Sequence, residues 1–98
     1  MFSSMFREKE KTVEKKIIAY AKGKGWRNHK WTSPGKRGPT DQFFTKSPSR
    51  IVFMEVKRDE DEEPTPQQVR EQRLLREEGF PVFTVKSFEE ARAIFDAL

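Results

Sequence analysis

The sequence RIVFMEVK, residues 50–57, decides the fold. Its β-branched and aromatic residues are typical of a buried strand, but the charged residues Glu55 and Lys57 stand within it. Side chains two residues apart in a strand project from the same face, so Glu55 and Lys57 share one face with the apolar residues before them. The alternate positions are apolar throughout: Val52, Met54 and Val56. Since both faces begin apolar, the pattern predicts a central strand, one face of which leaves the core at Glu55.

The segments before this strand predict a helix and two further strands. Residues 7–24 have apolar residues at three- and four-residue steps, which is the period of an amphipathic helix. Residues 26–32 and 41–46 have the composition of strands, and the sequence SPGKRGPTD (33–41) forms a loop between them. The short turn at residues 47–49 predicts an antiparallel meander with the central strand.

The segments after the central strand predict helix, strand and helix. Thr65 is a favourable N-cap with Pro66 at the first helical position, and Gly79 is placed to end that helix. Residues 81–86 follow as a strand and residues 87–98 as a final helix. The order is therefore α-β-β-β-α-β-α, an α/β fold, and 98 residues suffice for one domain spanning residues 1–98.

Composition excludes several classes of protein. The sequence has no apolar run of 18 residues, and its start, MFSSMFREKEK, lacks the apolar core of a signal peptide. It has no cysteine, which excludes disulfides and thiolate metal sites. We therefore expect a cytoplasmic protein that is not secreted.

Charge is distributed unevenly along the chain. Residues 1–50 carry 13 Lys and Arg against 4 Asp and Glu, a balance of +9, whereas residues 51–98 carry 7 against 12, a balance of −5; these sum to the net +4. A basic half favours a polyanionic partner, with nucleic acid first and an acidic membrane second. A solvated surface whose charges segregate by chance is the simpler interpretation.

A second carboxylate stands near the first in the predicted sheet. Asp41 opens the strand before the turn, so antiparallel pairing places it across from the Glu55–Lys57 end. Two carboxylates from neighbouring strands, with a backbone carbonyl, suit Mg²⁺ or Mn²⁺, and a lysine beside them can steady the charge of a phosphodiester under attack. Alternatively, Asp41 is a turn residue and the Glu55–Lys57 pair is a structural ion pair.

These residues together resemble the PD-(D/E)xK nuclease superfamily, and more narrowly its VRR-NUC branch. The similarity covers nearly the whole chain: an acid-bearing first helix around Glu14, the loop ending in Asp41, MEVK with Glu55 and Lys57, and TPQQ (65–68) on the next helix. One departure is visible. The family usually shows Gly-x-Pro-Asp, whereas the proline here stands one position earlier, in Gly38-Pro39-Thr40-Asp41.

The resemblance implies a fold and a set of roles. The fold would be a restriction-endonuclease-like core, with a mixed central sheet flanked by helices. Asp41, Glu55 and the Val56 carbonyl would bind the metal, and Lys57 would be the catalytic lysine. Gln68 and Glu14 would lie near the site as further catalytic residues.

Some polar and aromatic residues could instead have purely local roles. Gln68 stands three residues after Thr65 and could complete a capping box, and Glu14 could be a solvated residue on the flank of its helix. The acids of residues 59–63 are typical of a solvated connection. The single histidine, His29, suits a strand surface or a DNA-facing position better than a general base. Trp26 and Trp31 face opposite sides of their strand, so at least one should be buried.

The combined pattern favours a metal-dependent DNA endonuclease. Phosphates would be held by basic residues of the loop, the first strand and the first helix: Lys36, Arg37, Lys30 and Lys15. A chain this small has little area for base readout, which favours recognition of DNA structure. A nucleic-acid-binding module without activity and an interaction domain with a structural acid–lysine pair are the alternatives.

The resemblance also implies a homodimer acting on branched DNA such as four-way (Holliday) junctions. Two active sites related by a two-fold axis suit two symmetric cuts. The apolar N-terminal residues Met1, Phe2, Met5 and Phe6 stand before the predicted helix, so residues 1–6 could form an arm that a partner covers. A disordered start to the chain is the alternative.

Overall fold

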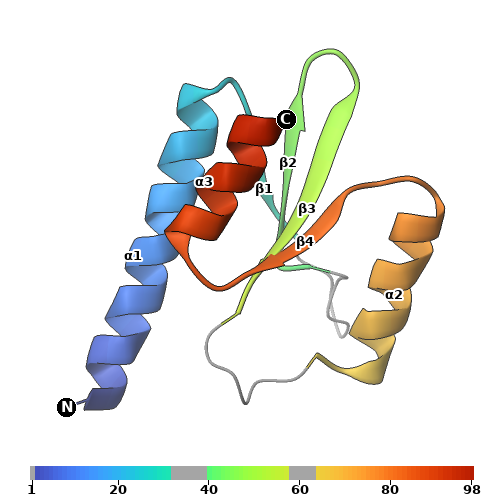
Figure 1. The fold of residues 1–98 in the computed structure, drawn as a ribbon. Helices are drawn as coiled ribbons and strands as arrows, with labels where there is room; N and C mark the ends of the chain where they lie inside the picture. The colour runs from blue at the N-terminus through green and yellow to red at the C-terminus, as the bar shows by residue number, and fades with distance from the viewer. Residues whose placement is uncertain (1, 32–39, 58–63) are drawn as a thin grey trace.

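The computed structural model describes residues 2–31, 40–57 and 64–98, with the backbone alone for residues 2–11. Its elements follow the predicted order α-β-β-β-α-β-α (Figure 1). Their bounds are α1 Phe2–Gly23, β1 Arg27–Lys30, β2 Gln42–Lys46, β3 Arg50–Val56, α2 Pro66–Glu77, β4 Val82–Val85 and α3 Phe88–Ala97. The acids of residues 59–63 and the loop residues Lys36 and Arg37 lie outside the described residues.

The four strands form one mixed sheet in the order β1-β2-β3-β4. The first three strands are antiparallel, as the short turn predicted, and β4 pairs with β3 in parallel. The strand RIVFMEV is therefore flanked on both sides, which confirms that it is central. The α/β class and the mixed sheet flanked by helices are likewise confirmed.

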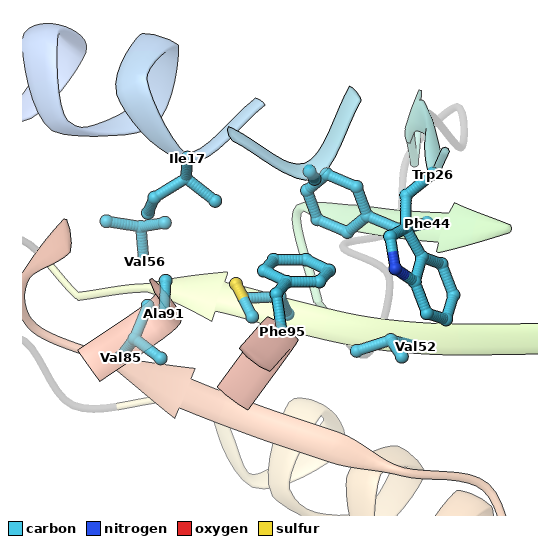
Figure 2. Close-up of a cluster of buried hydrophobic side chains, with 10 residues drawn as sticks. Ile17, Trp26, Phe44, Val52, Val56, Val85, Ala91 and Phe95 are labelled. Atoms are coloured by element: carbon cyan, nitrogen blue, oxygen red, sulfur yellow. The ribbon is translucent and has the colours of Figure 1, made fainter. Parts of the chain in front are cut away.

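One face of the sheet carries the main hydrophobic core. The even-numbered residues of β2 and β3, Phe44, Val52, Met54 and Val56, pack there with residues from α1 and α3 (Figure 2). Phe95 of α3 lies in the middle, with its ring edge-on to the rings of Trp26 and Phe44 at 5.8 and 5.1 Å between centroids. Trp26 is 3% exposed, so the expectation that at least one tryptophan is buried is confirmed.

The helix ends follow their sequence signals, with one correction. The Thr65 hydroxyl accepts a hydrogen bond from the Gln68 amide at 3.1 Å, and Ser87 caps α3 in the same way through Glu90. Gly79 ends α2 at φ 93°, a conformation that glycine adopts without strain. Helix α1, however, begins at Phe2 rather than near Arg7. Phe2, Met5 and Phe6 therefore lie within the helix, not before it.

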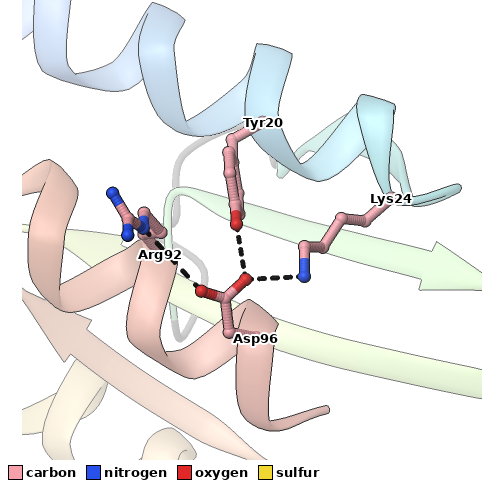
Figure 3. Close-up of polar contacts among 4 residues, drawn as sticks. All are labelled: Tyr20, Lys24, Arg92 and Asp96. Carbon is pink, nitrogen blue, oxygen red and sulfur yellow. Dashed lines mark hydrogen bonds and ion pairs between the residues drawn. The ribbon is translucent and has the colours of Figure 1, made fainter.

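The two terminal helices lie side by side on the core face and are joined by a polar cluster (Figures 1 and 3). Asp96 of α3 accepts a hydrogen bond from the hydroxyl of Tyr20 on α1 and pairs at 2.6 Å with Lys24, which directly follows α1. Arg92, one turn earlier on α3, lies 3.7 Å from the same carboxylate. The hydrogen bonds from Lys24 and Tyr20 lower the pKa of Asp96, and the bond to Asp96 raises the pKa of Lys24.

Among the described residues, no helix has the length and apolar character needed to cross a membrane. Even the 22-residue sequence of α1 contains many charged residues.

Candidate active site

Asp41 and Glu55 meet at the end of the β2–β3 pair. The antiparallel register pairs Gln42 with Met54, so the next step places Asp41 across from Glu55. The Asp41 amide donates a hydrogen bond of 2.9 Å to Oε2 of Glu55, and the Asp41 carbonyl accepts one of 2.9 Å from the Trp31 amide. The predicted position of Asp41 opposite the Glu55 end of β3 is therefore confirmed.

Gln68 reaches the same carboxylate from α2. Its side-chain amide donates to Oε1 of Glu55 at 3.3 Å, and the residue is 2% exposed. The Thr65 hydroxyl caps α2 by accepting a hydrogen bond from the Gln68 backbone amide. Gln68 therefore takes part in the helix cap through its backbone and in the site through its side chain. The Gln68 side chain thus bonds with Glu55, whereas a capping box would turn it back to the cap. Two N–H donors from two elements hold the Glu55 carboxylate in place.

Sequence analysis missed a second buried glutamine on the same helix. Gln72 follows Gln68 by four residues, which puts it on the same side of α2, and it is 7% exposed. By contrast, Val69 and Leu74 on the same helix are exposed. The spacing of four residues indicates that the two glutamines share one side of the helix but does not show that this side is buried.

Lys57 and Val56 follow Glu55 directly. Lys57 is half-buried, and its amide donates to the Val85 carbonyl at 2.9 Å, which extends the β3–β4 pairing by one residue. Val56 has its side chain in the core on the opposite face (Figure 2). The alternation of the strand therefore places Glu55 and Lys57 on the face away from α1 and α3.

The other predicted residues are more scattered. Glu14 is half-buried on α1, three and four residues before the core residues Ile17 and Ile18, which is the predicted flank position. Lys15 and Lys30 are exposed on α1 and β1. The phosphate-binding roles predicted for these lysines, and for Lys36 and Arg37 of the loop, stay predictions.

The donor set fits a hard divalent cation. Asp41 and Glu55 are oxygen donors on neighbouring strands, and Glu55 is oriented by N–H groups in the way that ligating carboxylates usually are. The described part of the chain contains no group of three or more His, Cys, Asp or Glu side chains placed to hold a metal ion together. A site here would therefore rest on two carboxylates with a backbone carbonyl, as the resemblance implies.

Aromatic rings lie next to these carboxylates on the same face. His29 of β1 pairs with Phe43 of β2, and Phe43 pairs with Phe53 of β3, so the three side chains cross the sheet in one row. The rings of His29 and Phe43 stack at 4.7 Å and 12°. Trp31 and Phe80 extend the row, with ring centroids 5.9 and 6.2 Å from Phe53. We call these five residues the aromatic row.

Comparisons with known proteins agree with this arrangement. No family model matches the chain. "Putative nuclease p44" of Acyrthosiphon pisum secondary endosymbiont phage 1 is 33% identical over 79 residues, which are 81% of this chain and 84% of that protein. A solved structure described as a VRR_NUC domain superposes with a TM-score of 0.78 at 32% identity, over 90% of this chain and 95% of the other.

Proposed function

Because the chain belongs to the VRR-NUC family of nucleases, we propose that it is a metal-dependent endonuclease that hydrolyses DNA phosphodiester bonds in branched DNA. The contact of Glu55 with both Asp41 and Gln68 supports this proposal most directly. It gathers residues from two strands and a helix around one carboxylate, at an end of the sheet where Lys57 also lies. A structural ion pair alone would not need a buried glutamine aimed at the carboxylate.

In the proposed site, Asp41, Glu55 and the Val56 carbonyl would hold Mg²⁺ or Mn²⁺. Such a cation, when bound, polarises a phosphodiester and lowers the pKa of a coordinated water. Lys57 would place its ammonium beside the attacked phosphate and offset the negative charge that grows there. Gln68 would keep Glu55 in its ligating orientation. The resemblance also gives Glu14 a supporting role, although α1 packs on the opposite face of the sheet. These are the chain's own contributions to the reaction.

Substrate selection is proposed from the size and charge of the domain. A chain of 98 residues offers little surface for reading bases, so DNA shape is the better discriminator, and four-way junctions are the leading candidate. Lys36 and Arg37, with Lys15 and Lys30, would contact phosphates. Neutralising Lys36 and Arg37 together should then weaken binding to DNA of unrelated sequences to a similar degree. It should also reduce the slope of log binding constant against log salt concentration by about one to two.

We also propose a homodimer, since two sites related by a two-fold axis can cut a symmetric junction twice. Light scattering on the full chain gives the mass directly, and a monomer at micromolar concentration would reject this part of the proposal. A chain without residues 1–6 tests whether the start of α1 contributes to the contact.

The decisive experiment is cleavage of a panel of DNA substrates. Linear duplex, flap and four-way junction are each incubated with Mg²⁺, with Mn²⁺ and with a chelator. We expect cleavage only with a metal ion, fastest on a branched substrate, and reduced about 100-fold or more in Lys57→Ala. Lys86→Ala is the matched control, because Lys86 follows β4 as Lys57 follows β3. Binding without cleavage by the wild type, or full activity of a folded Lys57→Ala, would overturn the assignment.

A further inference from the structure

The aromatic row occupies the sheet face that carries Glu55, and it lies one step from the candidate active site. Phe43 follows Asp41 by two residues on β2, and Phe53 precedes Glu55 by two residues on β3. Two residues along a strand span about 6.6 Å, so the ring positions and the carboxylate positions form adjacent rungs of the sheet. A group held on the row would therefore lie next to a phosphate held at Glu55.

The row is exposed at both Trp31, which follows β1, and Phe80, which precedes β4. Trp31 is 36% exposed and Phe80 is exposed as well, whereas Phe53 is buried beneath them. His29 and Phe43 are half-buried, and the His29 ring is held by a contact of 2.9 Å between its Nε2 and the Thr45 hydroxyl. Among the described helices, α1 and α3 cover the opposite face and α2 packs on β4. Rigid rings thus remain accessible along β1 and β2.

We propose that the aromatic row stacks an unpaired nucleobase beside the scissile phosphate. Flat aromatic rings can stack on the π-face of any nucleobase, so stacking contributes to binding without sequence specificity. The exposed Arg27 lies two residues before His29 on the edge strand and therefore on the same face, where it can contact the phosphates of the same nucleotides. The inference rests on the proposed function and specifies it. Among branched substrates, binding is expected to be tighter where nucleotides at the branch are unpaired.

A second copy of the chain is a less suitable occupant of this face. A partner covering the row would also lie over the adjacent Asp41 and Glu55 and would close the site to DNA. A two-fold interface places the same patch on both subunits, which would bring the Arg27 side chains of the two copies toward each other. Both arguments favour a polyanion with exposed bases.

The test measures binding without divalent ions, so that no cleavage occurs. The probes are a blunt duplex and a fork with the same duplex and single-stranded arms. Trp31→Ala should weaken binding of the fork about five-fold or more and binding of the duplex less than two-fold, whereas Trp31→Phe should retain fork affinity. Leu74→Ala is the matched control, because Leu74 is exposed to a similar degree, 38%, but lies on α2 outside the row. This control should change the affinity for neither the fork nor the duplex.

Several outcomes would overturn the inference. Equal losses of affinity for the duplex and the fork, or no loss of affinity for the fork, would exclude stacking of a base on the aromatic row. A lower mass by light scattering for Trp31→Ala but not for Leu74→Ala would assign the face to a second copy. Should Trp31→Ala not fold, His29→Ala carries the same expectation. Failure here leaves the metal-dependent cleavage of the panel untouched, so the two proposals fail separately.

Discussion

The two faces of the sheet have opposite characters although the same strands form both. The face toward α1 and α3 is apolar and closed, with Phe95 at its centre (Figure 2). The other face has the aromatic row, the Glu55 carboxylate and a helix that turns two glutamines inward. Strand side chains alternate between the two faces of a sheet. Val52, Met54 and Val56 of β3 therefore pack in the core, and Glu55 and Lys57 project from the other face. The proposed site and the main hydrophobic core thus lie on opposite faces of one sheet.

The largest loss of stability is expected when the side chain at the centre of the core face is removed. Phe95→Ala deletes a buried ring that contacts Trp26 and Phe44, and we expect it to lower the free energy of unfolding by about 3–5 kcal/mol. Val69→Ala on the exposed side of α2 should stay within about 0.5 kcal/mol of the wild type. Denaturant titration measures both. A small loss for Phe95→Ala would show that the core face is not where stability resides.

Changes on the other face should affect activity more than stability. Glu55→Gln and Asp41→Asn should each weaken Mn²⁺ binding, measured by calorimetry, and reduce cleavage about 100- to 1,000-fold, because hard cations prefer charged oxygens. Glu55→Gln leaves one acceptor oxygen for two N–H donors, so it should cost only about 1 kcal/mol of stability. Glu89→Gln on α3 is the control. Unchanged ion affinity in both site variants would place the metal elsewhere.

The smallest effect is expected from the polar cluster outside both faces. The folded-state pKa of Asp96 lies below its ordinary value of 3.8, so its contribution to stability is present above that value and is lost as the pH falls through the folded pKa. Wild-type stability should therefore fall more steeply below about pH 4 than that of Asp96→Asn. Thermal melts at pH 7 and pH 3 in low salt compare the two. Parallel pH profiles would mean that the cluster contributes nothing.

Much of the fold followed from the sequence because its signals were local. The short turn at 47–49 and the period of two fixed the pairing of β2 with β3, and this pairing alone brought Asp41 to Glu55. Thr65 and Gly79 set the ends of α2 through backbone interactions that any context would preserve.

The errors arose where burial depended on a distant partner. Gln72 is polar, and its burial depends on what lies against α2, which spacing along the helix does not specify. The start of α1 was placed too late, although Phe2, Met5 and Phe6 have helical spacing, because the segment has no capping signal. The aromatic row emerged only from the pairing of β1, β2 and β3.

The polar cluster of Figure 3 joins residues that are far apart along the chain, and this bears on how the domain assembles. Tyr20 and Asp96 are separated by 76 positions, whereas Asp41 and Glu55 are separated by 14 and Glu55 and Gln68 by 13. Closing a short loop costs less entropy than closing a long one, so contacts near in sequence tend to form first. The β2–β3 hairpin and the first turn of α2 should therefore acquire their native arrangement early in folding. Docking of α1 on α3, which unites the two ends of the chain, would be the late step that makes the assembled domain cooperative.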